Sequence, residues 1–486
     1  MTTEIRSEAL VAVIGAGTMG AGIAQVAAAA GHEVVVVDAA EDALERGRAT
    51  VAKGLGGLIR RGKLDEAGKA AVEGRIVWST DLARTAPAAL AIEAIVETIE
   101  AKRSLFALLA DLLGPDAILA SNTSSLSIAA LAEGLPRPER FLGLHFFNPV
   151  PVMKLVEVVA HPATDPAIAE AASALMRRWG KHPVAVRDVP GFIVNRVARP
   201  YYAEAFAALG EGMDPTTIDH ALTAAGGFRM GPLALADLIG QDVNYAVACS
   251  VFEAYEGQTR FRPQDSQRAL TENGRLGRKT GGGVHDYSAE LPAPRFATDG
   301  PQPRTITVGD PGLLAPLIEA AREAGLTIKL ADLPPATLRA DGVTLALGDG
   351  RPLAERKGVD VLIDHARDFA SAETLLFTPR APLAAAVAAG FARAIGRKAL
   401  LLPDRPGQLV LRTLAQLANA AADAVTDGVA SAEAIDEAMR YGANHPEGPL
   451  AWANRVGHAS VRTALEYIAE ATSDPIYRPA PLFAAP

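Results

Sequence analysis

The feature that most constrains this fold is a glycine-rich turn at residues 15–20. An apolar run at 10–14 predicts a buried parallel strand before it, and the run at 34–37 predicts the next strand after an intervening helix. In the turn GAGTMG the first glycine permits a tight turn, the second lets backbone N–H groups approach a pyrophosphate, and the third allows close helix–strand packing. The unsatisfied N–H groups at a helix N-terminus favour such an anion. The candidate cofactor-binding residues are therefore Gly15, Gly17, Thr18, Met19 and Gly20.

An acidic residue closes the second strand and distinguishes this turn from an ordinary glycine-rich loop. A GxGxxG pattern alone is a weak signal, but a strand before it, a helix after it and Asp38 at the end of the next strand together predict dinucleotide binding. Asp38 would accept hydrogen bonds from the adenosine ribose, and its charge would repel a 2′-phosphate, which favours NAD over NADP. The alternative is that Asp38 is a solvated turn residue.

Two more apolar segments extend the α/β pattern. Residues 91–97 predict a strand that leads into a helix near 100–113, and residues 117–125 predict another strand that ends in small polar residues. Because ligands bind at the carboxyl ends of parallel strands in an open sheet, we expect Glu97 and residues 122–124 to face the cofactor cleft.

The charged, helical segment 41–73 has two interpretations. Its basic residues lie on a solvated helix face, or they form an arm that meets the phosphates of an anionic substrate. These residues are Lys53, Arg60, Arg61 and Lys63.

A histidine and a glutamate on either side of a proline-rich turn form the candidate catalytic pair. Two apolar strands flank the turn at 148–151, which places His145 and Glu157 on neighbouring strands. A histidine in such an apolar setting is more often a satisfied core residue than a catalyst. A carboxylate within reach favours catalysis, because it orients one imidazole nitrogen and stabilises the imidazolium. Near neutral pH such a histidine can take the proton of a hydroxyl group as a hydride leaves.

Six stretches of the sequence together resemble a known family. They cover most of residues 8–288 and read GAGTMGAGIAQVAA, EAIVE, ASNTSSLSI, HFFNPVPVMKLVEVV, GKHPVAVRDVPGFIVNR and GPLALADLIG. In this order and spacing they are similar to the L-3-hydroxyacyl-CoA dehydrogenases, which reversibly oxidise a (3S)-3-hydroxyacyl-CoA to the 3-oxoacyl-CoA with NAD. The resemblance implies an α/β Rossmann-type dinucleotide-binding domain followed by an all-α helical domain.

The resemblance also implies a role for each candidate site residue. His145 would be the general base and Glu157 its partner. Ser124 and Asn195 would hydrogen-bond the substrate hydroxyl and then the carbonyl as it forms. Without the family pattern, both residues read equally well as residues near helix N-termini. The residues implied at the nicotinamide and its ribose are Glu97, Lys102 and Asn122.

The sequence departs from the family pattern in several places. A serine expected to contact CoA in the charged arm is Gly54 here, and Arg61 stands at a lysine position that contacts the CoA phosphates. The contacts implied for the CoA substrate are therefore Ser124, Arg61 and Asn195. The close of the helical domain reads KTGGGVHDY, and we interpret its His285 as structural or superficial, since no motif pairs it with the site.

The chain continues well beyond the length of a family member with one helical domain. Residues 188–213 align with 404–429, so a second, duplicated helical domain is expected. Asn195 is replaced by Leu411 in the second copy, which predicts a structural role for it. This tandem arrangement resembles the long dehydrogenases of bacterial phenylacetate catabolism, whose substrate is 3-hydroxyadipyl-CoA.

Between the two helical domains the sequence predicts a spacer. Residues 290–304 are proline-rich and predict a linker, after which small α/β elements without a glycine fingerprint are expected at 305–309, 311–324 and 327–332. The expected domains are 1–187 (NAD-binding Rossmann domain), 188–289 (helical domain), 290–402 (linker and small degenerate α/β spacer) and 403–486 (second helical domain).

Composition excludes several other classes of protein. The chain has 47 Lys and Arg against 56 Asp and Glu, a formal net charge of −9, so no nucleic-acid partner is expected. The first ten residues lack the apolar stretch of a signal peptide, and the apolar segment 381–392 is too short to span a bilayer. We therefore expect a cytoplasmic protein with no membrane partner. With a single cysteine, no metal site is expected.

Three functions stay open at this point. The first is NAD-dependent oxidation of 3-hydroxyadipyl-CoA in phenylacetate degradation, the second is a 3-hydroxybutyryl-CoA dehydrogenase of butanoate or fatty-acid metabolism, and the third is a non-catalytic NAD-binding structural protein. A substrate with a terminal carboxylate would require a cation in the acyl pocket, for which Arg196, Arg199 and Arg229 are candidates. The expected partner is the acyl-CoA substrate, and the expected assembly is a homodimer or an internal pseudo-dimer.

Overall fold

The computed structural model describes residues 5–6 and 8–484 of the 486-residue chain. Contacts divide the chain into two compact units: unit 1 comprises Met1–Val194 and Gly428–Ala443, and unit 2 comprises Asn195–Asp427 and Asn444–Pro486. Among the described residues, no helix is long and apolar enough to cross a membrane. The prediction from the first ten residues falls partly on 1–4 and 7, which lie outside the described residues, and the cytoplasmic location stays a prediction.

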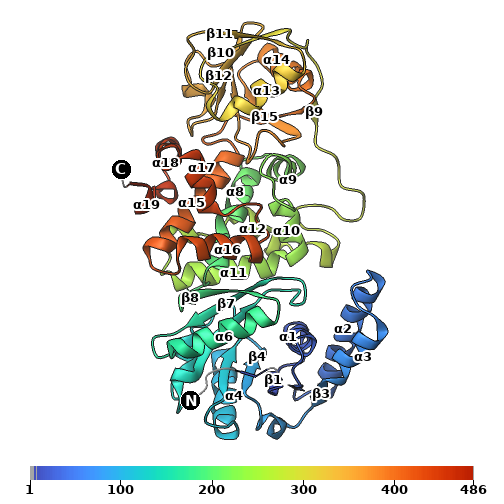
Figure 1. The fold of residues 1–486 in the computed structure, drawn as a ribbon. Coiled ribbons are helices and arrows are strands. Elements are labelled where there is room, and N and C mark those ends of the chain that lie inside the picture. The colour runs from blue at the N-terminus through green and yellow to red at the C-terminus, as the bar shows by residue number, and fades with distance from the viewer. Residues whose placement is uncertain (1–4, 7, 485–486) are drawn as a thin grey trace. The chain divides into compact units, whose positions relative to one another are not determined.

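Unit 1 is built on a sheet of eight strands within the described residues (Figure 1). The strand order is β3-β2-β1-β4-β5-β6-β7-β8, and every neighbouring pair is parallel except the antiparallel β6 and β7. The central strands β1 and β2 are apolar and fully buried, as a parallel strand covered on both faces requires. The strands are β1 (Val11–Ile14), β2 (Val34–Val37), β3 (Ile76–Ser79), β4 (Leu90–Glu93), β5 (Ile118–Ser121), β6 (Phe141–Phe146), β7 (Leu155–Ala160) and β8 (His182–Arg187).

Helices connect these strands in the order that the sequence predicts. The glycine-rich turn leads directly into α1, and the charged segment forms α2 and α3, which contact each other and α1. Together, α2 and α3 form an arm beside the sheet (Figure 1). The helices of this part of unit 1 are α1 (Thr18–Ala29), α2 (Glu41–Arg60), α3 (Glu66–Gly74), α4 (Ile99–Leu112), α5 (Ile128–Ala132) and α6 (Pro166–Arg178).

A segment from far along the chain completes unit 1. Helix α16 (Ala432–Gly442) packs against β7 and β8, although more than 240 residues separate it from them. The amide of Arg187, at the end of β8, donates to the carbonyl O of Val429 at 3.0 Å. His182 Nε2 at the start of β8 lies 2.9 Å from Glu437 Oε2 of α16. The segment therefore covers the edge of the sheet at β8.

Unit 2 contains two groups of helices and a second sheet. The short helix α7 (Val194–Val197) leads into the first group, and α15 is the longest helix of the second group, with 14 of its 17 residues buried. The first group is α8 (Arg199–Gly210), α9 (Pro215–Ala224), α10 (Pro232–Ile239), α11 (Gln241–Ala254) and α12 (Asp265–Glu272). The second group in this unit is α15 (Val410–Thr426), α17 (Pro449–Val456), α18 (His458–Thr472) and α19 (Pro481–Ala484).

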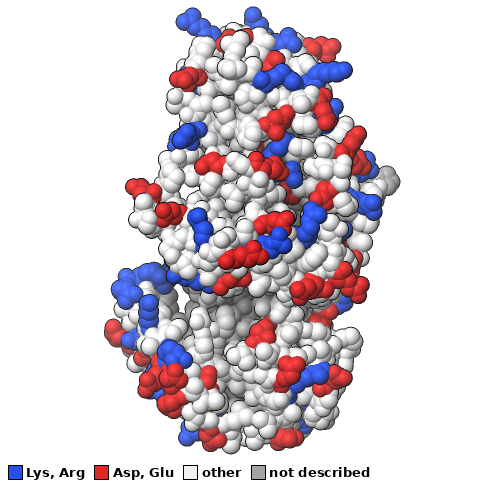
Figure 2. Space-filling model, turned by 180° about the vertical axis from the view of Figure 1, so that it is seen from behind, with Lys and Arg blue, Asp and Glu red and all other residues white. Residues whose placement is uncertain are grey.

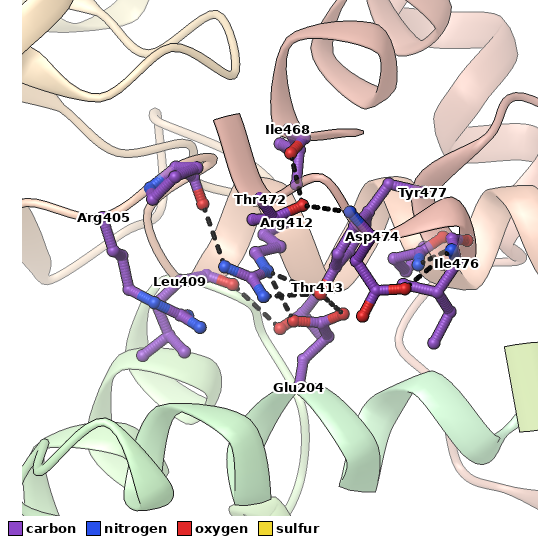
Figure 3. Close-up of polar contacts among 12 residues, drawn as sticks. Glu204, Arg405, Leu409, Arg412, Thr413, Ile468, Thr472, Asp474, Ile476 and Tyr477 are labelled. Atoms are coloured by element: carbon purple, nitrogen blue, oxygen red, sulfur yellow. Dashed lines mark hydrogen bonds and ion pairs between the residues drawn. The ribbon is translucent and has the colours of Figure 1, made fainter. Parts of the chain in front are cut away.

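A buried ion pair joins the two helical groups at the contact of α8 with α15. Figure 3 shows Glu204 rising from α8 toward Arg412 of α15. Arg412 Nε lies 2.7 Å from Glu204 Oε2, and the side chains are 6% and 3% exposed. The hydroxyl of Tyr477 donates to Glu204 Oε1 at 2.8 Å and accepts from Arg412 Nε at 3.0 Å. Each charge therefore has an oppositely charged partner although both are removed from water.

The sheet of the spacer has more strands than the sequence predicts. Its sheet has eight strands within the described residues, in the mixed order β11-β10-β12-β13-β14-β15-β16-β9. Residues 296–297 lie inside the expected linker but form an edge strand against β16. This strand has only two residues, so no longer apolar run marks it in the sequence. The expected elements at 305–309, 311–324 and 327–332 are confirmed as β10, α13 and β11. The elements are β9 (Phe296–Ala297), β10 (Thr305–Val308), α13 (Ala315–Glu323), β11 (Thr327–Leu330), β12 (Thr337–Ala340), β13 (Val343–Leu347), β14 (Val361–Ile363), β15 (Thr374–Pro379), α14 (Pro382–Ala394) and β16 (Lys398–Leu401).

A buried carboxylate ties this second sheet to α15. Asp364 follows β14 directly and is 1% exposed. Its two oxygens accept the amides of Leu409, Val410 and Leu411 at 2.9, 2.8 and 3.1 Å. Burial raises the pKa of Asp364, although these N–H donors oppose that rise. The start of α15 is therefore fixed to the end of β14.

Candidate active site

The glycine-rich turn between β1 and α1 has the geometry that a dinucleotide requires. Gly15 adopts φ +105°, and a Cβ there would lie 2.5 Å from the carbonyl O of Ala94. A Cβ at Gly20 would lie 1.8 Å from the carbonyl O of Gly15, so only glycine lets α1 approach the turn this closely. Gly17 differs, since no atom lies within 4 Å of a Cβ added there, and no side chain caps the α1 amides that begin at Thr18 and Met19. A pyrophosphate fits this open cradle of N–H groups.

Asp38 stands at the end of β2, where the ribose of a dinucleotide would lie. Its Oδ2 accepts the amide of Ala16 at 2.8 Å, and its Oδ1 accepts the amide of Ala40 at 3.1 Å. These bonds fix the carboxylate beside the glycine-rich turn, so Asp38 is an anchored group and not a freely solvated turn residue. Its position and charge suit a ribose with an unmodified 2′-hydroxyl.

Three charged side chains form a cluster at the carboxyl end of β4. Lys102 of α4 is 1% exposed, and its Nζ lies 2.6 Å from Glu93 Oε1 and 3.1 Å from Glu97 Oε2. Burial opposes ionisation of Glu97, but Lys102 and the hydroxyl of Thr123 more than offset it, so the pKa of Glu97 lies below its usual value. Glu93 is fully buried and also accepts from Ser121 Oγ at 2.6 Å. Sequence reasoning named Glu97 and Lys102 but missed Glu93, whose signal is a carboxylate at the end of an apolar strand.

The polar residues after β5 gather around Glu97. Its Oε1 accepts Thr123 Oγ1 at 2.6 Å and the amide of Ser124 at 2.9 Å, and it lies 3.4 Å from Ser124 Oγ. Asn122 Oδ1 instead accepts the amide of Phe146 at 2.9 Å, which ties the end of β5 to the end of β6. The structure therefore brings together Glu97, Lys102 and Ser124, and places Asn122 beside the strand that carries His145.

His145 and Glu157 form a buried pair on neighbouring strands, as the sequence predicts. They are opposite each other in the register of β6 and β7, and His145 Nδ1 lies 2.6 Å from Glu157 Oε2. Glu157 is fully buried, and its Oε1 accepts the amides of Ile193 and Val194 at 3.0 Å each. An ionised carboxylate only accepts, so this geometry assigns the ring proton to Nδ1. Nε2 then carries a lone pair, and the pair can act as a base and its orienting group.

Asn195 follows directly after Val194, whose amide Glu157 accepts. It lies in α7 and is the first residue of unit 2. The hydrogen bond from the amide of Val194 to Glu157 fixes the start of α7, and so it also fixes the chain immediately before Asn195.

The arm carries an exposed group of basic residues. Figure 2 shows blue side chains gathered on this arm, at the left of the view. The basic residues on the arm include Lys53, Arg60, Arg61 and Lys63, and these four are exposed. The structure thus makes Arg61 available to an anion, while the CoA contact itself stays a prediction.

His285 is a structural residue, as one of the two interpretations has it. It is 6% exposed, and its Nε2 lies 2.7 Å from Asp219 Oδ2. Burial opposes protonation, but Asp219 more than offsets that effect and the pKa of His285 is raised. Asp219 also accepts the amides of Leu233 and Ala234 at the start of α10. The pair therefore holds helices of unit 2 together.

Family models of known proteins match both ends of the chain. The model described as "3-hydroxyacyl-CoA dehydrogenase, NAD binding domain" matches residues 10–189. The model described as "3-hydroxyacyl-CoA dehydrogenase, C-terminal domain" matches residues 191–287 and 407–485. The first match contains the glycine-rich turn and the His145–Glu157 pair.

Individual relatives agree with these models. The 3-hydroxyadipyl-CoA dehydrogenase of Escherichia coli strain K12 is 42% identical over 97% of this chain and 96% of its own. A probable 3-hydroxybutyryl-CoA dehydrogenase of Deinococcus radiodurans is 43% identical over 57% of this chain and 99% of its own. A crystal structure of 3-hydroxybutyryl-CoA dehydrogenase from Escherichia coli K12 covers 99% of this chain and 98% of its own, at 40% identity and a TM-score of 0.89. This chain is an NAD-dependent oxidoreductase, and it belongs to the 3-hydroxyacyl-CoA dehydrogenase family.

Proposed function

We propose that this enzyme oxidises a (3S)-3-hydroxyacyl-CoA to the 3-oxoacyl-CoA, with 3-hydroxyadipyl-CoA as its substrate. The observation that carries the reaction is the buried contact of 2.6 Å between His145 and Glu157 on adjacent strands. The substrate class is supported by the similarity to a 3-hydroxyadipyl-CoA dehydrogenase over 97% of this chain. That substrate would place the enzyme in phenylacetate degradation.

In this proposal the protein residues bind the substrate and move one proton. Bound NAD supplies the hydride acceptor for C3 of the substrate. His145 Nε2 takes the proton of the C3 hydroxyl, while Glu157 keeps the opposite ring nitrogen protonated and stabilises the imidazolium. Ser124 and Asn195 donate hydrogen bonds to the oxygen as it becomes a carbonyl.

The cofactor-binding roles extend to the glycine-rich turn and the charged cluster. The pyrophosphate would lie on the amides that follow Gly17, and Asp38 would hold the adenosine ribose. Glu97 and Lys102 would contact the nicotinamide ribose. Glu97 is partly exposed, and its contacts with Lys102 and Thr123 hold its carboxylate in place. Asn122, which the end of β6 fixes, would lie beside the nicotinamide.

We also infer that the second half of the chain is a degenerate copy of the first. The aligned helix starts are anchored alike: Glu157 accepts the two amides before Asn195, and Asp364 accepts the aligned amides of Leu409 and Val410. The strand and helix pattern agrees, since β14–β15–α14–β16 repeats β6–β7–α6–β8 with the same antiparallel and parallel pairings. The copy has Leu411 where the first has Asn195, so it would be structural.

The two copies would form an internal pseudo-dimer. Two contacts support this arrangement: the buried Glu204–Arg412 pair between α8 and α15, and the packing of α16 against β7 and β8. In such an arrangement one chain supplies both halves of the assembly, so light scattering is expected to give the mass of a single chain. The mass of two chains would contradict the pseudo-dimer and favour the homodimer. The domain divisions at 187, 289 and 402 belong to the same proposal.

Initial rates test the proposed reaction. The measurement is NADH oxidation with 3-oxoadipyl-CoA and with acetoacetyl-CoA, and turnover of both with a faster rate for the dicarboxylate is expected. A preference for acetoacetyl-CoA would instead favour the 3-hydroxybutyryl-CoA dehydrogenase alternative, which the relatives of that name support. Turnover of neither, with NADH still bound, would favour a non-catalytic protein. His145→Ala should abolish turnover and leave NADH binding nearly unchanged, because the histidine lies outside the glycine-rich turn.

A further inference from the structure

A small cavity of about 20 Å³, enough for a water molecule or a single small polar group, lies inside unit 2, between α8, α15 and a 3₁₀ turn at Thr259–Phe261. Arginines supply an unusual share of its polar lining. The charged residues that line the cavity are Arg196, Arg199, Arg260, Glu204 and Asp423. The lining therefore contains one more cation than anions, which suits an anionic group.

Two of these arginines already have carboxylate partners. Arg196 forms an ion pair with Asp427, and Arg260 forms one with Asp423. Glu204 is held by the buried ion pair with α15 that joins the two helical groups. Four of the five charged lining residues therefore have an oppositely charged partner, and Arg199 is the fifth.

Arg199 is the lining arginine that has no anion. Among the described residues, no carboxylate lies within ion-pair distance of it, and its Nε is buried without a hydrogen-bond partner. Its guanidinium lies over the ring of Tyr202, 5.0 Å from the centroid, which offsets only part of the cost of removing the charge from water. Burial accordingly lowers the pKa of Arg199. A partly buried guanidinium without a carboxylate partner can therefore bind an anionic ligand.

The position of Arg199 along the helix relates it to Asn195. Helix α7 ends at Val197 and α8 begins at Arg199, and Ala198 between them keeps a right-handed helical backbone conformation with φ −77° and ψ −9°. Four residues advance an ideal helix by about 6 Å along its axis and by about 40° around it. Arg199 therefore lines the cavity about one helical turn after Asn195 and on nearly the same side of the helix.

We propose that Arg199 binds the terminal carboxylate of the dicarboxylyl-CoA substrate and so determines the acyl preference. The inference rests on the function proposed above, in which Asn195 holds the oxygen on C3. In 3-hydroxyadipyl-CoA three C–C bonds of about 1.5 Å separate C3 from the terminal carboxylate carbon. That length is shorter than the advance of about 6 Å along the helix, and the long side chain of Arg199 can span the difference. A 3-hydroxybutyryl chain ends one carbon after C3 and leaves Arg199 unpaired.

The test replaces the charge and compares two substrates. Arg199→Leu is expected to lower kcat/KM for 3-oxoadipyl-CoA by about 10- to 100-fold, mainly through KM, because a charge-assisted hydrogen bond is lost. The value for acetoacetyl-CoA should stay within about threefold of the unmodified enzyme. Arg199→Lys should restore part of the loss, since it keeps the charge. Arg322→Leu is the matched control, because Arg322 is exposed on α13 and lies outside the lining of the cavity.

A binding measurement separates this inference from the proposed reaction. Adipyl-CoA and hexanoyl-CoA have the same chain length and differ in the terminal carboxylate, so tighter binding of adipyl-CoA is expected, and Arg199→Leu should remove the difference. Equal losses for both substrates, or no loss for either, would overturn the role of Arg199. If the unmodified enzyme turns over neither oxoacyl-CoA, the proposed function fails, and the comparison of the two CoA ligands still decides the inference.

Discussion

Replacing Glu157 by glutamine tests how the site keeps His145 reactive. Glu157 Oε2 lies 2.6 Å from His145 Nδ1, while its Oε1 accepts the amides of Ile193 and Val194 at 3.0 Å each. Glutamine has nearly the same shape and keeps an oxygen for the two amides, so Glu157→Gln should fold. Its NH₂ group, however, would donate a hydrogen bond to His145 Nδ1, at the place where the carboxylate oxygen of Glu157 accepts one. Nδ1 must then accept, the ring proton moves to Nε2, and Nε2 can no longer take the substrate proton.

The expected loss combines the wrong tautomer with the removal of a charge. Water does not replace the carboxylate, because Glu157 is fully buried and His145 is 6% exposed. We expect kcat to fall by about 10³-fold, or about 4 kcal/mol in the barrier, with little change in KM. The assay is steady-state oxidation of the 3-hydroxyacyl-CoA at saturating NAD, with NADH binding and thermal melting measured on the same protein. Glu170→Gln is the control, since Glu170 is exposed on α6.

A kcat within about threefold of the unmodified enzyme would refute this reasoning, because no wrong tautomer could then be present. A large fall in melting temperature together with the loss of activity would show that Glu157 acts mainly through the two amides. The prediction requires the loss of kcat with melting and NADH binding nearly unchanged.

Three further predictions concern the rest of the chain. Arg412→Met should destabilise the protein by about 3–5 kcal/mol, because it leaves Glu204 buried without its cation. Adding Glu204→Met should recover most of the loss in melting temperature, whereas additive losses in the double variant would contradict this reasoning. Asp38→Ser should raise KM for NADH by about tenfold and narrow the preference over NADPH, measured by rates with both cofactors, whereas an unchanged preference would show that Asp38 does not read the ribose. The pKa of His285 is raised by its contact with Asp219, so this pair stabilises the fold below the unfolded pKa of about 6.5 and loses its effect as pH rises through the higher folded value. The melting-temperature difference between the unmodified protein and His285→Gln should therefore be larger at pH 6 than at pH 9, and a difference independent of pH would contradict it.

Local patterns in the sequence were sufficient for the parts of the site that one α/β unit builds. The turn at Gly15, the position of Asp38 directly after β2 and the register of His145 with Glu157 all follow from short apolar runs and the turns between them. Each of these features depends on residues close together in the chain. Their recognition therefore needed no knowledge of distant contacts.

Features that depend on distant or weakly patterned residues were missed. The strand β9 has only two residues, so it shows neither the apolar run nor the alternation that would indicate a strand in this sheet. Asp219, the partner of His285, is 66 residues away along the chain. Glu93 lies inside a segment that was interpreted only as a strand, although a buried carboxylate at its end requires a cation such as Lys102.

The packing of α16 against β8 also has a consequence for the order in which the protein is made. The edge of the first sheet is covered by Gly428–Ala443, which a ribosome synthesises more than 230 residues after β8. During that interval the nascent chain presents an uncovered strand edge, and such an edge readily pairs with other chains. Synthesis of the second sheet and all of α15 must precede closure of unit 1. The nascent enzyme should therefore bind chaperones longer than its N-terminal position in the chain would indicate.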